Sequence, residues 1–329
     1  VLGMILNYFS FLFFGFFSVF FRISNNYDVI LATQLSPVLS LLPAIWIKKK
    51  YNIPIVLWVL DLWPESFFAN TNFRIKFLDI LINRISNKIY NNSDSILITS
   101  NYFKSKIEKR LVSNKKFIFF PNWAEDIFNN AHLHKIKNEY FLPEGFNIVF
   151  TGNIGYSQGF EDILIAAKLT YNYPINWILI GDGRRKEFIL NEIKTNNIKN
   201  VFLAGRHPLE FMPYYFSKAD CLLITLKQDE VFSNTIPGKF QSYLTAGKPI
   251  LGNVSGEVMQ LITNNNLGLA CEPGNPELLS ELAIKFSKFS KSKLNEFGEN
   301  SLKLHTSVFR KELIFESLID ELNLLNNNN

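Results

Sequence analysis

Residues 147–183 read NIVFTGNIGYSQGFEDILIAAKLTYNYPINWILIGDG, and this stretch decides the fold. A strand is predicted over Asn147–Thr151, a helix over Phe160–Leu169 and a second apolar strand over Trp177–Ile180. Glycine follows each of the two strands. Because strand and helix alternate with short links, the stretch predicts one right-handed repeat of a parallel sheet.

The same alternation extends in both directions along the chain. Further strands are predicted over residues 201–204, 220–226, 249–253 and 268–271, with helices over residues 184–195, 212–216, 238–245, 276–289 and 308–322 and another from Glu257. Upstream, strands are predicted over residues 28–33, 55–60, 95–99 and 117–120, with helices over residues 37–50, 73–90 and 101–111. Ser100 is placed to cap the last of these helices. The pattern predicts an α/β protein with two Rossmann-like parallel sheets.

A chain of 329 residues is long enough for two domains. The boundary is predicted after Asn122, where the chain leaves the last upstream strand and turns polar. This gives a first domain over residues 1–122, a second over residues 123–305, and a C-terminal segment over residues 306–329. The first domain is expected to be incomplete, because its first convincing strand follows Tyr27 and no Gly-rich turn precedes it.

Composition excludes several classes of protein. A hydrophobic content of 47% with 19% charged residues argues against a disordered chain. The net charge of +5 is a mild excess without the concentrated basic face that nucleic-acid binding predicts, and it suits a membrane surface or a phosphorylated substrate as well. Cys221 and Cys271 lie in no metal-binding or disulfide pattern, and His132 and His134 are expected to be solvated loop residues. No metal or cofactor is therefore predicted.

Residues 2–21 form an uncharged run, LGMILNYFSFLFFGFFSVFF, which ends at Arg22. A run of this length is about enough to span a bilayer. Three interpretations remain open: a membrane span, an interfacial or buried aromatic helix, and a signal-like segment. Polar residues such as Asn7 and Ser10 count against a membrane span. A signal peptide would begin with basic residues, and none precedes this run. The aromatic rings favour a position at the membrane interface.

Glycines follow three successive strands of the second half. Carboxyl ends of parallel strands meet at one edge of a sheet, where open α/β sheets bind ligands. Glycine at such positions allows a ligand to approach the backbone closely, although each one alone would also suit an ordinary turn. The binding candidates from these turns are Gly152, Asn153, Gly155, Gly181, Gly183 and Arg206.

The strongest local signal is FSNTIPGKFQSYLTAGKP, residues 232–249. Within it, Pro237-Gly238-Lys239 opens a predicted helix, whose free N–H groups form a ready anion site. Lys239 would add a compact positive charge there. Arg206 is the second cation that is placed to offset the negative charge of a diphosphate. A plain helix start with a surface lysine is the alternative.

Six stretches of the chain, in order, resemble glycosyltransferase family 4, which has the GT-B architecture. Within that family, the chain looks similar to WbuB-type bacterial polysaccharide glycosyltransferases, including L-fucosamine transferases. The matching stretches are LWVLDLWPES (residues 57–66), FFPNWAE (119–125), FTGNIGYSQG (150–159), IGDG (180–183), AGRHP (204–208) and residues 233–249.

The resemblance implies a nucleotide-sugar donor on the second domain, the acceptor over the first, and a C-terminal helix that crosses back to the first domain. It implies retention of anomeric configuration and no obligatory metal. The expected reaction moves a sugar, such as an N-acetylated deoxysugar, from a UDP-sugar to a lipid-linked oligosaccharide of O-antigen or capsule. The enzyme is expected at the cytoplasmic face of the inner membrane, peripheral or anchored by its N-terminal helix.

The sequence also departs from the family pattern. Many members carry two glutamates at the positions of Asn234 and Ser242, and an Arg and a Lys at those of Asn153 and Gln158. More of the phosphate binding is then expected from Lys239 and Arg206. Gln241 and Ser242 are candidates for contacts with the donor ribose. Donor contacts from this segment are expected at Ser233, Thr235, Pro237, Gly238, Lys239, Gln241 and Ser242.

Two carboxylates follow the predicted strand over residues 55–60. Asp61 and Glu65 lie at the carboxyl edge of the first sheet, where a carboxylate could orient or deprotonate an acceptor hydroxyl. Alternatively, Asp61 caps the turn and Glu65 forms an ion pair. Trp58 and Trp63 are candidates for stacking on a sugar or facing a membrane, and for Trp58 packing in the core is favoured.

Two other functions remain open at this stage. A sugar epimerase on the same two-domain architecture would convert the nucleotide sugar without an acceptor. A non-catalytic nucleotide-sugar-binding protein is the second alternative.

Overall fold

The computed structural model describes residues 2–22, 26–69, 76–129 and 142–327. The chain divides into two compact units, Val1–Pro121 with Glu312–Asn329 (unit 1) and Asn122–Lys311 (unit 2). His132, His134 and the start of the helix predicted over residues 73–90 lie outside the described residues. The sequence-based domain boundaries after residues 122 and 305 stay a prediction.

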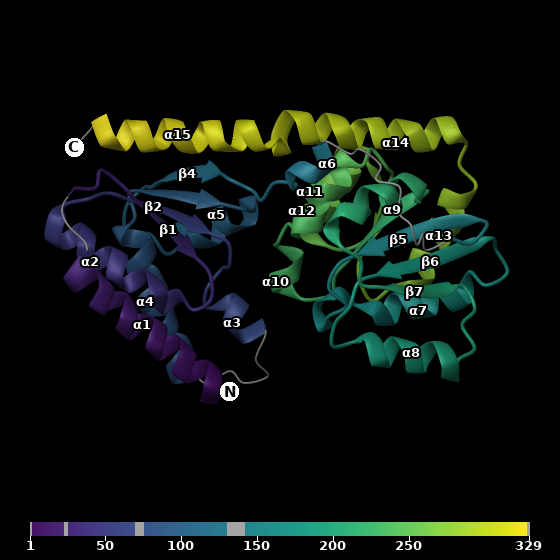
Figure 1. Cartoon of the computed structure of the whole chain (residues 1–329), viewed down its shortest axis with the longest axis horizontal. Coiled ribbons are helices and arrows are strands. Elements are labelled where there is room, and N and C mark those ends of the chain that lie inside the picture. Colours follow the sequence, from purple (N-terminus) through teal and green to yellow (C-terminus); the bar gives the residue numbers. More distant parts are fainter. Residues whose placement is uncertain (1, 23–25, 70–75, 130–141, 328–329) are drawn as a thin grey trace. The chain divides into compact units, whose positions relative to one another are not determined.

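Unit 1 is built on a four-stranded parallel sheet with the order β1-β2-β3-β4 (Figure 1). The central strands are apolar almost throughout because both of their faces are covered. In β2, for example, four of the five residues of IVLWV are buried. The strands are β1 Ile30–Gln34, β2 Ile55–Val59, β3 Ser95–Ile98 and β4 Lys116–Phe119.

The helices of unit 1 are α1 Leu2–Arg22, η1 Val38–Leu41, α2 Leu42–Tyr51, α3 Glu65–Ala69, α4 Lys76–Asn92, α5 Asn101–Glu108 and most of α15 Lys311–Asn327. The predicted cap of α5 is confirmed, since the Ser100 hydroxyl accepts a hydrogen bond from the Tyr102 N–H at 3.2 Å. Helix α15 is tied to the sheet by an ion pair between Glu321 and Lys116 of β4.

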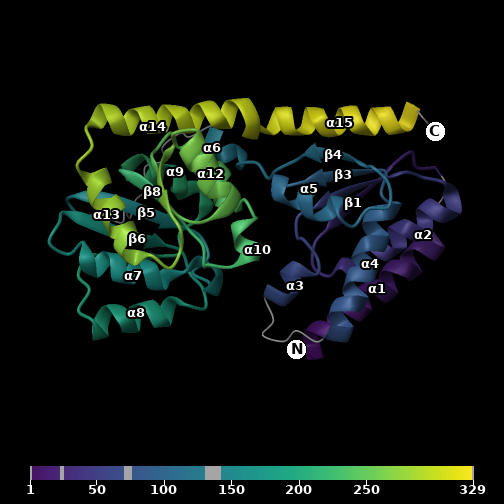
Figure 2. The same ribbon diagram turned by 180° about the vertical axis from the view of Figure 1, so that it is seen from behind.

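Unit 2 is built on a six-stranded parallel sheet with the order β10-β9-β8-β5-β6-β7. Figure 2 shows β8, β5 and β6 of this sheet. After β5, the chain adds β6 and β7 on one side of β5. It then returns to the other side of β5, where it adds β8, β9 and β10 in turn. Neighbouring β5 and β8 therefore form the switch point of the sheet. The strands are β5 Phe146–Thr151, β6 Ile175–Ile180, β7 Val201–Gly205, β8 Cys221–Thr225, β9 Ile250–Asn253 and β10 Gly268–Cys271.

The helices of unit 2 are α6 Asp126–Asn129, η2 Tyr156–Gln158, α7 Phe160–Leu169, α8 Lys186–Thr195, η3 Leu209–Phe211, α9 Met212–Lys218, α10 Glu230–Ser233, α11 Gly238–Thr245, α12 Gly256–Asn264, α13 Pro276–Ser287 and α14 Lys291–Leu304. A π-helical turn, His305–Phe309, follows α14. Its Phe309 ring packs 5.8 Å from that of Phe240 in α11, so the helix predicted over residues 308–322 begins later, at Lys311. The predicted α/β class with two parallel sheets is confirmed.

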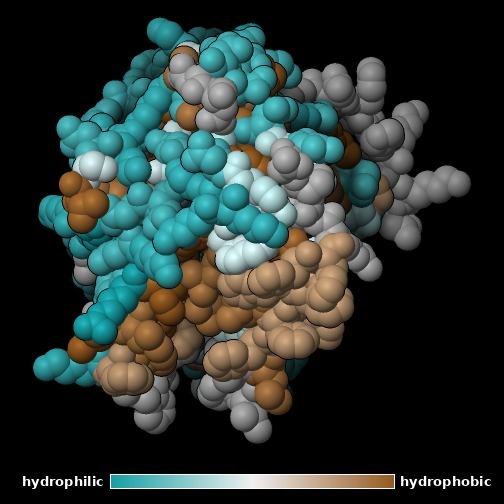
Figure 3. Space-filling model, turned by 90° about the vertical axis from the view of Figure 1, so that its left-hand side faces the viewer, coloured by the Kyte–Doolittle hydropathy of each residue, from teal (hydrophilic) through white to brown (hydrophobic). Residues whose placement is uncertain are grey.

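Helix α1 turns a row of aromatic rings to solvent. Phe13, Phe17 and Phe20 are more than half exposed, whereas Val19 is buried. Figure 3 shows apolar side chains gathered on the lower part of this face of the molecule. Among the described helices, none is both long and apolar enough to cross a bilayer. The prediction of an interfacial aromatic helix is compatible with this exposure but is not tested by it.

Candidate functional site

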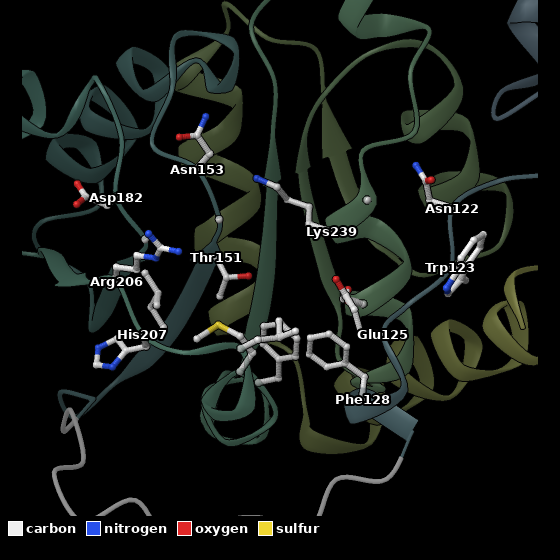
Figure 4. A pocket seen from close by; sticks show the side chains of 18 residues that line it. Asn122, Trp123, Glu125, Phe128, Thr151, Asn153, Asp182, Arg206, His207 and Lys239 are labelled. Atoms are coloured by element: carbon white, nitrogen blue, oxygen red, sulfur yellow. The ribbon is translucent and has the colours of Figure 1, made fainter. Parts of the chain in front are cut away.

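A cavity of about 720 Å³ lies at the carboxyl edge of the unit 2 sheet, beside the switch point between β5 and β8 (Figure 4). This volume is in the usual range for small-molecule and cofactor sites. The lining residues are Asn122, Trp123, Glu125, Phe128, Thr151, Gly152, Asn153, Ile180, Gly181, Asp182, Arg206, His207, Leu209, Met212, Phe216, Gly238, Lys239 and Ser242.

Glycine forms part of the cavity edge because two strand ends touch there. Gly181 has a φ of +149°, and a Cβ atom on it would lie 1.8 Å from the carbonyl oxygen of Gly152. A side chain at this position would therefore push the β5 and β6 loops apart. Gly152 and Gly181 both line the cavity, as the sequence pattern suggested.

Gly155 and Gly183, which were also predicted to bind the donor, lie outside the cavity lining. A Cβ on Gly183 would meet the Ile154 carbonyl oxygen at 2.4 Å, and one on Gly155 would meet the Asn153 amide at 2.7 Å. Gly183 lets two neighbouring loops pack closely, and Gly155 leaves room for the Asn153 side chain of its own loop. Neither glycine is part of the cavity lining, whereas Asn153 is.

Lys239 projects into the cavity from the first turn of α11. Its ammonium donates a hydrogen bond to Gln158 Oε1 at 2.6 Å and lies 3.9 Å from the centre of the Phe150 ring. Among the described residues, no carboxylate pairs with it. Loss of hydration lowers the pKa of Lys239 from its ordinary value near 10.5 to about 7. A bound anion would restore the charge that this environment disfavours.

Arg206 and His207 lie on one wall of the cavity, just after β7. Arg206 is exposed and forms no ion pair with any residue in the described ranges. The His207 ring lies 3.0 Å from the Ala204 carbonyl oxygen and 3.3 Å from the Tyr215 hydroxyl, so it is held in place. This wall can supply a positive charge and an aromatic edge to a ligand.

The opposite wall carries a carboxylate above an aromatic pair. Glu125 precedes α6, and one of its carboxylate oxygens lies 3.4 Å from Ser242 Oγ of α11. Phe128 stacks on Phe216, with ring centroids 5.5 Å apart and planes 14° from parallel. The cavity thus combines cations, a carboxylate and an apolar floor, a combination that suits a ligand with charged, hydroxylated and flat parts.

The structure brings together Gly152, Asn153, Gly181, Arg206, Gly238, Lys239 and Ser242, all predicted from the sequence. Besides Gly155 and Gly183, four other predicted positions are not part of the cavity lining. Ser233 bonds Ser255 Oγ at 2.6 Å, and Pro237 precedes the first turn of α11. Thr235 lies between them in the chain. Gln241 is fully buried, and its amide faces the Pro237 and Gly238 carbonyls at 3.0 and 2.9 Å.

Sequence reasoning missed several lining residues, notably Trp123, Glu125, Phe128, His207 and Met212. Trp123 and Glu125 belong to the motif FFPNWAE, and His207 to AGRHP, yet neither motif was given a role for these residues. Helical periodicity offers one usable signal. Lys239 and Ser242 are three residues apart on one face of α11, whereas Gln241 falls on another face.

The predicted acceptor-side carboxylates lie in unit 1. Asp61 follows β2, and burial raises the pKa of its carboxyl group despite a hydrogen bond with Ser36. Glu65, at the start of α3, forms an ion pair with Arg110, which also donates to the Trp63 carbonyl at 2.7 Å.

The prediction that Trp63 stacks on a sugar or faces a membrane is wrong. Its side chain is only 3% exposed and its ring packs 5.4 Å from that of Phe67. A tryptophan of this size stabilises the core of unit 1 and cannot reach a ligand without opening it. Trp58 is partly buried, and its Nε1 donates to the Phe120 carbonyl at 3.2 Å.

Two parallel α/β units, one with a cation-lined cavity at the carboxyl edge of its sheet, have the architecture of the GT-B class of proteins. Residues 134–304 match the family model described as glycosyl transferases group 1. The match covers more than half of the 329 residues, and the chain belongs to this glycosyltransferase family.

Relatives and solved structures agree with this placement. The chain is 24% identical over 291 residues to the probable glycosyltransferase WbjE of Pseudomonas aeruginosa, covering 86% of this chain and 72% of WbjE. It is 25% identical over 186 residues to WcaI of Escherichia coli K12, a putative colanic acid biosynthesis glycosyl transferase, covering 55% and 44% of the two chains.

A solved structure of Anabaena HepE in complex with UDP shows the same fold. Its TM-score is 0.70 at 14% identity, with 91% of this chain and 79% of HepE covered. HepE in complex with UDP-glucose matches with a TM-score of 0.65 at 16% identity, over the same shares of the two chains.

Proposed function

We propose that this chain transfers a sugar from a UDP-linked donor to a lipid-linked saccharide in the synthesis of a bacterial surface polysaccharide. One observation carries the proposal: the unit 2 cavity holds Lys239 without a carboxylate partner among the described residues, next to the N-terminus of α11. A dehydrated lysine at a helix N-terminus suits a diphosphate.

The donor class is supported by the structural neighbour HepE, which has been solved with UDP and with UDP-glucose. The polysaccharide context is supported by WcaI, whose name assigns it to colanic acid biosynthesis. The resemblance to WbuB-type enzymes supports retention of configuration and an N-acetylated deoxysugar such as L-fucosamine. Asp61 and Glu65 remain the candidates for acting on the acceptor, with Asp61 favoured because Glu65 already neutralises Arg110.

Labelled UDP-sugars incubated with the protein and bacterial membranes test the proposal. We expect label to pass from one UDP-sugar into the lipid fraction, with UDP released in equal amount. A sugar epimerase would instead change the nucleotide sugar when membranes are left out. If neither lipid labelling nor UDP release occurs with any donor of the panel, the proposed reaction is wrong.

We also propose that the protein binds the cytoplasmic face of the inner membrane through α1. The exposed rings of Phe13 and Phe17 belong to this helix, while Phe20 packs 4.5 Å from Trp46 of α2. Helix α2 ends in Lys48, Lys49 and Lys50. Aromatic rings beside a basic cluster are the combination that binds anionic lipid surfaces.

Sedimentation with phosphatidylglycerol vesicles tests this membrane proposal. The double variant Phe13→Ser/Phe17→Ser should partition into vesicles about tenfold less, or lower still, because it removes two apolar rings. Val112→Ser is the control, since Val112 is 90% exposed on another part of unit 1. Equal partitioning of the double variant and the wild type would contradict a role for α1.

A further inference from the structure

We infer that Glu125 binds the ribose hydroxyls of the nucleotide and so fixes which way the donor lies in the cavity. The inference rests on the proposed function, because it assumes a nucleoside diphosphate as ligand.

Glu125 is an available carboxylate within a cavity that also contains cations. The only hydrogen-bond partner of its carboxylate in the described part of the chain is Ser242 Oγ, which donates at a long 3.4 Å. It forms no ion pair there, although Lys239 and Arg206 line the same cavity. A carboxylate accepts hydrogen bonds and cannot donate them, so its ligand must present O–H or N–H groups.

The order of groups along the wall agrees with the order of groups in a nucleoside diphosphate. Figure 4 shows Glu125 between Lys239 and Phe128. The cation suits the diphosphate, and Phe128 and Phe216, largely buried side chains that both line the cavity, form an apolar floor against which the base can lie. The part of the nucleotide between diphosphate and base is the ribose, whose two vicinal hydroxyls match the two oxygens of a carboxylate.

Charge supports the same assignment. A carboxylate placed against the diphosphate would repel it, whereas a ribose carries no charge and offers two donors. The sequence proposed Gln241 and Ser242 for the ribose. Since Gln241 is fully buried, Ser242 remains, and it is the residue that contacts Glu125. Glu125 and Ser242 together form the ribose contact.

Calorimetric titration of the full chain with UDP, 2′-deoxy-UDP and 3′-deoxy-UDP tests the inference. The wild type should prefer UDP over each deoxy analogue by about tenfold, the usual worth of a hydrogen bond to a charged group. Glu125→Ala should bind UDP about tenfold more weakly and lose most of this preference. Glu125 is exposed, so the variant is expected to fold, which its melting temperature checks.

Asp126→Asn is the matched control, because it removes a neighbouring carboxylate that pairs with Lys311 outside the cavity. It should keep the full preference for UDP. A Glu125→Ala variant that keeps the preference would overturn the inference while leaving the proposed donor intact. Absence of UDP binding by the wild type would overturn both. An effect on UDP-glucose binding without any effect on UDP would place Glu125 at the transferred sugar and overturn the ribose assignment.

Discussion

The two parallel sheets differ at their carboxyl edges. In unit 2, the strands β5 and β6 end in Gly152 and Gly181, whose backbones touch, and the space beyond them is a cavity with Lys239 on its wall. In unit 1, the chain after β2 carries a large side chain, Trp63, and a charged one, Glu65. Trp63 is buried, and Glu65 forms an ion pair with Arg110.

The difference shows that the same alternation of strands and helices can end either in a packed sheet edge or in a binding cavity. At the edge of unit 1, the charges of Glu65 and Arg110 offset each other, and Arg110 also donates to the Trp63 carbonyl, so these groups are engaged within the fold. At the edge of unit 2, a cation and a carboxylate are left without ion-pair partners among the described residues, at some cost to stability. Groups held in this way are typical of binding sites, which is why donor recognition is assigned to unit 2.

The largest effect is expected from Gly181→Ala. The new Cβ would lie 1.8 Å from the Gly152 carbonyl oxygen, at a φ of +149° that alanine rarely adopts. We expect a loss of at least about 3 kcal/mol in the free energy of unfolding, together with loss of UDP binding. Urea denaturation and calorimetry measure the two effects.

Gly205→Ala is the control for this variant. Its φ is +77°, yet no atom lies within 4 Å of the added Cβ, so only about 1–2 kcal/mol of backbone strain is expected. Equal stability losses in the two variants would contradict the close contact between the β5 and β6 ends.

The second effect concerns the cation of the cavity. Lys239→Met keeps an apolar stem against Phe150 but removes the ammonium, and UDP binding should weaken by about 1.5–3 kcal/mol, roughly tenfold to a hundredfold. The control is Lys248→Met, a lysine of the same unit whose pKa is also lowered by burial but which is not among the lining residues. Unchanged UDP affinity in Lys239→Met would remove Lys239 from the site.

A third effect tests the other sheet. Arg110→Ala leaves Glu65 without its partner and the Trp63 carbonyl without its donor. We expect the free energy of unfolding to fall by about 1–2 kcal/mol, with UDP affinity unchanged. Denaturation and calorimetry on the same sample separate the two. A large loss of UDP affinity in a folded variant would break the contrast between the units.

The smallest effect is the pH dependence of donor binding. With a pKa of about 7, Lys239 is increasingly neutral above pH 7 in the ligand-free chain. A bound diphosphate favours its charged form, so UDP-glucose affinity should fall above pH 7 by at most about 1.4 kcal/mol per pH unit and stay level below it. Lys239→Met should lack this fall.

The stability of the ligand-free chain changes with pH in the opposite direction to the donor affinity. An unfolded lysine keeps its proton up to about 10.5, whereas folded Lys239 loses it near 7. The unfolded state therefore binds more protons between these values, and wild-type stability relative to Lys239→Met rises with pH across this window. A difference in stability that does not change with pH would contradict the lowered pKa.

Much of the fold was predictable because it follows from local patterns. Continuous apolar runs such as IVLWV predicted the central strands, and Ser100 predicted the start of α5. Element ends were less predictable, because tertiary contacts set them. At the end of the π-helical turn, for example, the Phe309 ring packs against Phe240, a residue far away in the sequence.

The candidate site was predictable only in part. Gly152, Gly181 and Lys239 were found because strand ends and helix starts are visible in the sequence. Glu125 was not assigned a role, since its contact Ser242 lies 117 residues away and nothing local indicates the pairing. Trp63 was misjudged because its burial comes from the packing of α3 and its neighbours.

Hydrogen–deuterium exchange of the full chain, with and without saturating UDP, tests the central claim most directly. The account predicts slower amide exchange at residues 151–155 and 238–245 of unit 2, the segments that carry Gly152 and Lys239. Saturable UDP binding without protection of either segment, or with protection confined to residues 61–69 of unit 1, would contradict it.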